Sequence, residues 1–468
     1  MNELPPNSTK PKYSFWLRLI SWKVLLPLFL LFVIVSTPFI VRLYYLSQVP
    51  LAEISFDLKK YATVNITDEE NGYIEYKEAV AKLVMSSKPK GGDDLDIAHD
   101  EKDWSHATPA IKKWLKDNQK ALAIWKKGTG KTRFLSKQPQ ENSTKQFLES
   151  VKISYTLNTL IILNAKRLAY EGKLEESKEW LQAMFLFGCQ WGQHTDLSIR
   201  LCWDSSCYRS VYQTFGWAND SRVTRAQLQQ AMRDCIQNEL QVVPLSTSLK
   251  YGYFSSKEFY LFGEFKKWCE ETSSVKGGFF QRAIWDIKFF IQGEPERSWR
   301  LQKHAIVNLL SEIDKPIFDQ SLQTIKYHFF KNLSNTLSAD KLETIIQQSK
   351  YTSKYFFLDG TVSLIYQRRK TRRRILQVVL AAQIYKRKHG KFPATTADLL
   401  AEGDLKTMPL DTTKRVKIEI TYRHKKGLTA VYIVKDGCTD HGGVDASWYN
   451  PERDYGYVLE GRTPGVEY

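Results

Sequence analysis

Residues 154–188 read SYTLNTLIILNAKRLAYEGKLEESKEWLQAMFLFG, and their pattern of apolar residues predicts the fold class. On both sides of Gly172, apolar or small side chains recur every three or four residues, which places them on one face of a helix. They are Leu157, Ile161, Ala165 and Leu168 before the glycine, and Ser177, Leu181, Met184, Phe185 and Gly188 after it. We therefore predict a helical hairpin that turns at Gly172, within a mainly α protein.

The turn of this hairpin, RLAYEGKLEES at residues 167–177, resembles the turn of a tetratricopeptide repeat. The period of about 34 residues that defines such arrays does not recur along the chain. A single hairpin cannot bury its own apolar face, so we expect neighbouring helices to cover it. Helical spacing also marks residues 222–242, 280–292, 298–313 and 338–350.

A further helix is predicted from Thr108 to Gly128, with signals at both ends. Thr108 suits the N-cap, Pro109 the first helical position and Gly128 the C-terminal end. One face of this helix would carry Ile111, Trp114, Leu115, Asn118, Ala121, Leu122 and Trp125.

The amino-acid composition limits the classes of protein to which the chain can belong. Of the 468 residues, 43% are hydrophobic and 25% charged, close to the averages of folded soluble proteins. These fractions exclude a mainly disordered chain, a collagen-like repeat and a multi-span transporter. Six cysteines are too few for a small scaffold held by disulfides.

Residues 24–41, VLLPLFLLFVIVSTPFIV, carry no charge. As a helix they would extend roughly 27 Å, which is enough to cross a hydrocarbon core. Aromatic residues that favour the headgroup zone flank the stretch on both sides. They are Trp16, Trp22, Tyr44 and Tyr45. We predict a single transmembrane helix, with the lipid bilayer as a partner.

The basic residues indicate the orientation of this helix. Lys10, Lys12, Arg18 and Lys23 precede it against one acid, Glu3. The positive-inside rule then keeps residues 1–23 in the cytoplasm and exports the chain from about residue 42. We predict an inner (cytoplasmic) membrane protein. A cleaved signal peptide and a buried core helix are the alternatives.

The sequence GTGKT at residues 128–132 matches the end of a Walker A loop. Trp125 stands where the first glycine of that loop belongs, and a helix rather than a strand precedes the motif. We therefore interpret it as a helix C-terminus followed by a basic turn, and we expect no nucleotide partner.

Four residues with side chains that can bind a soft metal ion follow one another closely, namely Cys189, His194, Cys202 and Cys207. Their spacing is irregular for zinc, so buried thiols or one disulfide are the favoured interpretation. We find no nucleophile beside a base and predict no catalytic residue.

Six of the seven residues from Arg368 to Arg374 are basic. We interpret this run as the solvated start of a helix, with contact to an anionic surface as the alternative. An exported segment does not meet nucleic acid, so we expect no nucleic-acid partner.

The C-terminal part mixes helix and strand. A helix through Ile375 and Tyr385 ends at Gly390, and a short helix begins near Thr395 or Thr396. Residues 416–423 alternate apolar and polar side chains, which predicts a half-buried strand. A turn at 424–427 then leads to a second strand, LTAVYIV.

The run AAQIYKRKHGKFPATTADLLAEGDLKTMPLD, followed by strands and VKDGCTDHGG, resembles the globular half of type II secretion major pseudopilins. The likeness covers residues 372–445 and implies a small α+β domain with a calcium loop. The N-terminus lacks the Gly-Phe-T-L-x-E processing site of that family, so we expect no incorporation into a pilus by that route. The whole layout is similar to a family of uncharacterised bacterial membrane-anchored envelope proteins, whose middles carry a stretch like WLKDNQKALAIW.

Asp436, Asp440 and Asp445 are the candidate metal ligands of the implied loop. Carboxylates are hard oxygen donors, but carbonyls or water would have to complete a calcium shell of six to eight oxygens. An ordinary Asp-Gly turn loop is the favoured interpretation, and calcium is the one cofactor considered.

We therefore predict four parts, namely residues 1–23 in the cytoplasm, a transmembrane helix at 24–41, an α-helical exported region at 42–365 and a pseudopilin-like α+β domain at 366–468. The expected function is a non-catalytic scaffold or recognition module with a protein partner in the envelope. An accessory of a type II secretion or pilus-like system is the alternative, and an unrecognised envelope hydrolase is the third.

Overall fold

The computed structural model describes residues 22–89, 104–136, 144–261, 266, 279–320, 361–414, 416–425, 428–434 and 455–460. At 144–154 and a few further helical positions the description covers the backbone alone. The chain divides into two units, of which the first holds residues 1–53, 259–305 and 332–354, and the second holds the remainder. The described residues are mainly helical, which confirms the predicted class.

The first unit contains α2 (Trp22–Ser47), α14 (Phe279–Ile291) and most of α15 (Glu296–Leu310). An 18-residue window of α2 has a mean hydropathy of 2.7, and none of that window is buried. In the part of the chain that the structure describes, α2 is the one helix long and apolar enough to cross a membrane.

The end of α2 is tied to α15 by backbone contacts. Arg300 Nη1 donates to the carbonyl oxygens of Leu46 at 3.1 Å and Val49 at 3.2 Å. A ring nitrogen of His304 lies 2.8 Å from the carbonyl oxygen of Pro50. The residues that follow α2 are therefore held as part of this unit.

The second unit is built from helices and one small sheet. Its helices are α3 (Leu58–Ala62), α4 (Tyr73–Ala81), η2 (Trp104–His106), α6 (Pro109–Asp117), α7 (Gln119–Thr129), α8 (Thr144–Tyr170), α9 (Leu174–Trp191), α10 (Leu197–Asn219), α11 (Arg225–Gln241), α12 (Leu245–Leu261), η4 (Ile317–Asp319), α20 (Thr361–His389) and α21 (Thr396–Ala401). Its strands are β1 (Thr421–Lys425), β2 (Leu428–Ile433) and β3 (Tyr455–Glu460), paired antiparallel in that order.

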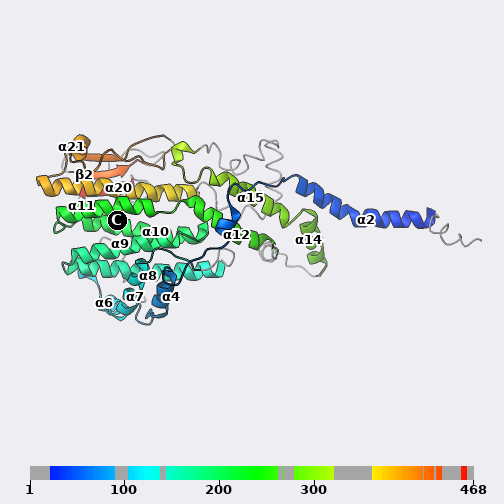
Figure 1. Ribbon diagram of the computed structural model, residues 1–468, viewed down its shortest axis with the longest axis horizontal. Coiled ribbons are helices and arrows are strands. Elements are labelled where there is room, and N and C mark those ends of the chain that lie inside the picture. The colour runs from blue at the N-terminus through cyan, green and yellow to red at the C-terminus, as the bar shows by residue number, and fades with distance from the viewer. Residues whose placement is uncertain are drawn as a thin grey trace, which may run out of the picture. The chain divides into compact units, whose positions relative to one another are not determined.

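The predicted hairpin is formed by α8 and α9. Gly172 adopts φ +80° at the turn, a conformation that favours glycine. Neighbouring helices cover the hairpin as expected, because α10 packs on both α8 and α9, and α20 packs on α10 and α11. Figure 1 shows α8, α9, α10 and α11 running side by side with α20.

The helix predicted from Thr108 to Gly128 is split in two at Asn118. Its start is confirmed, since the Thr108 hydroxyl accepts a hydrogen bond from the Ile111 amide and Pro109 opens α6. Buried Asn118 bonds instead to the segment near Val84, donating to its carbonyl at 3.2 Å and accepting from its amide at 2.8 Å. These bonds hold Asn118 where α6 ends and α7 begins.

Among the described residues, two large hydrophobic clusters stabilise this unit. In one, aromatic side chains of α4, α7 and α9 pack together, with Tyr76 4.6 Å from Phe187 and Trp125 stacked on Trp180 at 5.9 Å between ring centroids. In the other, α20 contributes Ile375 and its neighbours to a cluster shared with α9, α10, α11 and the sheet. The boundary predicted between 365 and 366 thus lies within α20, and one core joins its two sides.

The first strand begins later than predicted. β1 starts at Thr421, while Val416 and Ile418 are exposed before it. The backbone there pairs with a different segment, because the Asp411 amide donates to Ile418 and the Ile420 amide donates to Pro409, each at 2.8 Å. β1 also extends through His424 to Lys425, so the turn is shorter than expected.

Candidate functional site

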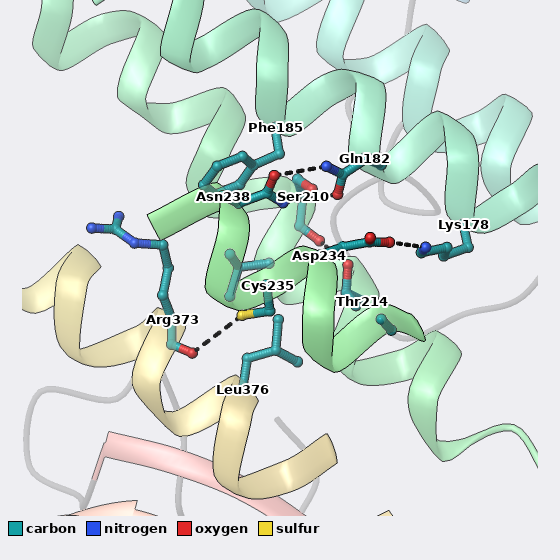
Figure 2. Close-up of a pocket in the computed structure, with 12 residues that line it drawn as sticks. Lys178, Gln182, Phe185, Ser210, Thr214, Asp234, Cys235, Asn238, Arg373 and Leu376 are labelled. Carbon is teal, nitrogen blue, oxygen red and sulfur yellow. Dashed lines mark hydrogen bonds and ion pairs between the residues drawn. The ribbon is translucent and has the colours of Figure 1, made fainter. Parts of the chain in front are cut away.

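The candidate site is a small cavity between α9, α10, α11 and α20, with a volume of about 30 Å³. Figure 2 shows polar side chains from α9 and α11 facing one another beside it. Lys178 of α9 forms an ion pair with Asp234 of α11, and Gln230 also donates to that carboxylate at 2.7 Å. A cavity of this size holds about one or two water molecules, which excludes an organic substrate in this conformation.

A second polar pair lies one turn further along both helices. Gln182 Nε2 donates to Asn238 Oδ1 at 2.7 Å, and Asn238 Nδ2 donates to Gln182 Oε1 at 2.8 Å. From the pair 178–234 to the pair 182–238, the residue number rises by four on both helices. The helices α9 and α11 therefore run parallel, and the two pairs hold them in one register. We call these two pairs the polar ladder.

Cys235 lines the same cavity but is not prepared for catalysis. Burial, with a smaller contribution from Glu239, raises the pKa of its thiol to about 12. A thiol with this pKa stays protonated at neutral pH, so it is a poor nucleophile. Its sulfur lies 3.8 Å from the carbonyl oxygen of Arg373, whose guanidinium points away from the cysteine in Figure 2.

The basic run of α20 is not solvated, so that interpretation is wrong. Arg369 Nη1 lies 3.0 Å from Asp204 Oδ2, and Arg374 Nε lies 3.7 Å from Glu239. Arg372 covers the ring of Tyr208 at 4.1 Å. The carboxylates and the ring come from α10 and α11, which sequence spacing alone does not bring to this run.

Asp204 also pairs with a second arginine, which is buried. Arg200, which is 1% exposed, places Nε 3.6 Å from Asp204 Oδ1. Its Nη1 donates to the Pro244 carbonyl at 3.1 Å and to the Ser248 hydroxyl at 3.3 Å. This cluster of Arg200, Asp204 and Arg369 links α10 to α20 and to the start of α12.

His194 is surrounded by aromatic groups. Its Nδ1 lies 2.8 Å from the Tyr251 hydroxyl, and Tyr251 packs edge-on against Tyr61 at 5.2 Å. Burial lowers the pKa of His194 to about 4, and the charge of Arg133 adds to that effect. A histidine that stays neutral in this way can act as a hydrogen-bond partner of the Tyr251 hydroxyl.

The GTGKT sequence forms the end of α7 and a turn that packs against residues of α4 and α9. Lys131 Nζ donates to the Glu69 carbonyl and lies 3.4 Å from Glu75 Oε1. Gln190 Nε2 donates to the Lys131 carbonyl, and Gly130 is the C-cap residue of α7. These contacts agree with the interpretation as a helix end and a basic turn.

Of the four residues that were considered as zinc ligands, two cysteines lie together. Cys189 and Cys207 are buried thiols with their sulfur atoms 3.9 Å apart, and the Cys207 thiol donates to the Phe185 carbonyl at 3.3 Å. His194 bonds to Tyr251 instead, and the side chain of Cys202 is outside the described residues. Cys189 and Cys207 are therefore buried thiols, which is one of the two interpretations that the sequence favoured.

The candidate calcium ligands Asp436, Asp440 and Asp445 lie outside the described residues. Among the residues that are described, no group of three or more His, Cys, Asp or Glu side chains is arranged to hold a metal ion.

Neither the polar ladder nor the arginine cluster was predicted from the sequence. A usable signal was present, because Lys178 and Gln182 are four residues apart, as are Asp234 and Asn238. Residues at that spacing share one helix face, so a polar stripe beside each apolar face predicts a polar contact between helices.

No family model matches the chain, and neither the curated proteins nor the solved structures contain a match. The resemblance to pseudopilins therefore stays a prediction.

Proposed function

We propose that this chain is a single-pass protein of the inner membrane, with residues 1–23 in the cytoplasm and the chain from residue 42 exported. In the envelope it acts as a non-catalytic scaffold or recognition module. The observation that carries the proposal is α2, whose apolar window has no buried residue while its C-terminal end is tied into the first unit. Exposed apolar surface of this extent requires a nonaqueous environment such as a bilayer.

The contacts at the end of α2 favour a retained anchor over a cleaved signal peptide. Arg42 Nη1 donates to the carbonyl oxygens of Phe290 at 2.7 Å and Glu294 at 3.1 Å. Leu46 packs against Gly293, where an added Cβ would meet its Cδ2 at 3.0 Å. Cleavage beyond Leu46 would remove the Arg42 guanidinium and the Leu46 side chain from these contacts.

The helical unit supports a role in recognition. Its buried polar groups, including the polar ladder and the arginine cluster, bond to one another and hold the helices in register. Such side chains position helices rather than transform a substrate. Arrays of packed helices commonly bind partners through the surfaces that remain outside.

The anchor can be tested with tags at both ends of the full chain. After washing membranes in alkaline carbonate, we expect both tags in the same membrane-bound polypeptide. Leu30→Arg combined with Val33→Arg should release the protein or prevent its insertion, because each charge at a helix centre costs about 3 kcal/mol. A shortened, soluble product that retains only the C-terminal tag would instead show a cleaved signal peptide.

The scaffold role can be tested by crosslinking within the native envelope. We expect one partner to be recovered at constant stoichiometry, with the same contacts in membranes of cells that express only the two proteins. A purified protein that turns over an envelope polymer would contradict the non-catalytic role.

A second candidate is an accessory of a type II secretion or pilus-like system. It is favoured by the order α20, α21, β1 and β2, which follows the helix, short helix and strand pair of the resemblance. Direct binding of the full chain to a purified major pseudopilin would support this candidate, and failure to bind any subunit of such a system would exclude it.

A further inference from the structure

Helix α14 presents an apolar face to the outside of the first unit. Phe280 is 80% exposed, Ile284 55% and Ile287 56%. Because they lie at positions i, i+4 and i+7, the three side chains share one face of the helix. We call this set the α14 apolar face.

The opposite face of α14 is also apolar, but it is the one that packs in the unit. Phe289 is buried, and Trp285 stacks on it with ring centroids 4.9 Å apart and planes 23° from parallel. Phe289 follows Phe280 by about two and a half turns, so the two point to opposite sides of the helix. The α14 apolar face therefore does not supply this buried packing.

The border between the two faces is polar. Gln281, Asp286 and Lys288 are exposed there, and Arg282 is exposed on the side of Phe289. Asp286 pairs with Lys266 at 2.8 Å, so its charge is balanced while Arg282 and Lys288 add positive charge. Apolar residues bordered by basic ones are typical of helices that lie in the headgroup zone of an anionic membrane.

The end of α2 fixes where α14 lies. The Phe39 and Phe290 rings meet edge-on at 5.4 Å, and the guanidinium of Arg42 covers the Phe290 ring at 4.7 Å. Arg42 also donates to the Phe290 carbonyl. Phe39 belongs to the last apolar turn of the span, and Arg42 is the first charged residue after it. Because Phe290 contacts both, it lies at the level where the hydrocarbon core meets the headgroups.

The direction of α14 is consistent with a position at the boundary between hydrocarbon and headgroups. Its C-terminal end contacts α2 through Phe290, and Figure 1 shows that the rest of α14 does not run alongside α2. A helix that leaves a spanning helix in this way extends along the bilayer surface rather than through the bilayer.

We infer that α14 is an interfacial helix, whose face of Phe280, Ile284 and Ile287 inserts into the outer leaflet of the membrane that α2 crosses. The occupant of this face is a phospholipid bilayer surface, and the inference rests on the anchor proposed above. α14 would then act as a second contact that sets the tilt of the anchored unit and keeps it close to the membrane.

The test uses the full chain in vesicles of phosphatidylethanolamine and phosphatidylglycerol. The photoreactive residue p-benzoylphenylalanine is placed singly at Val33, Phe280 or Arg282, and lipid adducts are measured by mass spectrometry after illumination. Position 33 reports the anchor, position 280 the α14 apolar face, and position 282 an exposed polar position on the opposite side of the helix. We expect adducts at 33 and 280, with at least about fivefold fewer at 282, since only the apolar face reaches the acyl chains.

The outcomes separate the two proposals. Adducts at 33 with equal, low yields at 280 and 282 would overturn the interfacial helix and leave the anchor intact. A lack of adducts at 33 would overturn the anchor and the inference with it. As a second check, Ile284→Glu with Ile287→Glu should abolish the adducts at 280 and preserve those at 33, because both side chains are exposed and tolerate replacement; adducts that persist at 280 would contradict the inference.

Discussion

Gln182 and Asn238 exchange two amide hydrogen bonds, of 2.7 and 2.8 Å, between the parallel helices α9 and α11. Asn238 is buried at 6% exposure, so each amide depends on the other for its partner. An amide pair satisfies donor and acceptor only in the matching register. We interpret the pair as a device that fixes how α11 packs on the hairpin.

Replacing one member of this pair should destabilise the fold. We expect Asn238→Ala to lower the free energy of unfolding by about 1–3 kcal/mol, because it leaves the Gln182 amide unpaired in a partly buried place. Replacing both, with Gln182→Leu and Asn238→Leu, should recover most of that loss. Urea denaturation measures both values, and a double variant that loses the sum of the two single effects would contradict a coupled pair.

Gly128 makes the close approach of α7 to α4. A Cβ at this position would lie 2.6 Å from Tyr76 Cε1, whereas at Gly216, on the exposed side of α10, it would meet nothing within 4 Å. We expect Gly128→Ala to destabilise the protein by about 1–3 kcal/mol through overpacking. The control Gly216→Ala should stabilise it by about 0.5–1 kcal/mol, since alanine favours helix. Equal shifts in denaturation midpoint would show that Gly128 is not a packing residue.

Asp204 balances two arginines inside the helical unit. Removing its carboxylate in Asp204→Ala leaves Arg200 and Arg369 without their common partner, and we expect a loss of about 3 kcal/mol. Glu179 serves as the control, because its 2.9 Å pair with Lys126 is exposed. Glu179→Ala should cost about 0.5 kcal/mol or less in the same denaturation experiment. A small effect of Asp204→Ala would mean that water replaces the carboxylate.

His194 should make stability depend on pH in the acid range. Its pKa is about 4 in the folded state and 6.5 ordinarily, so between these values the unfolded chain binds a proton that the folded chain does not. The free energy of unfolding therefore falls as pH drops from 6.5 to 4, by at most about 2–3 kcal/mol from this residue.

His194→Gln keeps a hydrogen-bond partner for Tyr251 and cannot titrate. We expect it to flatten the acid slope of the unfolding free energy measured between pH 6.5 and 4. Some slope should persist, because burial also lowers the pKa of His304. Identical slopes for the two proteins would contradict a buried, neutral His194.

Local signals in the sequence predicted much of the helical fold. Gly172 turns the hairpin, and Thr108 and Thr395 cap helices through their hydroxyl groups as expected. These features depend on neighbours a few residues away, so spacing is enough to find them. The break at Asn118 escaped prediction because its partner, Val84, is 34 residues distant.

The candidate sites were harder to predict for the same reason. The run Arg368 to Arg374 looks solvated in sequence, and only the packing of α20 on α10 and α11 brings Asp204 and Glu239 to it. Likewise, Lys131 fits the end of a nucleotide loop by sequence, while its ion pair with Glu75 depends on how α4 meets α7. Contacts of long sequence separation decide both outcomes.

The central claim is that α2 crosses the inner membrane and leaves the chain from residue 42 outside the cytoplasm. Protease added to intact spheroplasts tests it most directly, with antibodies against tags at the two ends. We predict that the C-terminal tag and the bulk of the chain are digested, while a short membrane-embedded fragment with the N-terminal tag survives. Full-length protein that resists digestion until the cells are lysed would contradict this topology.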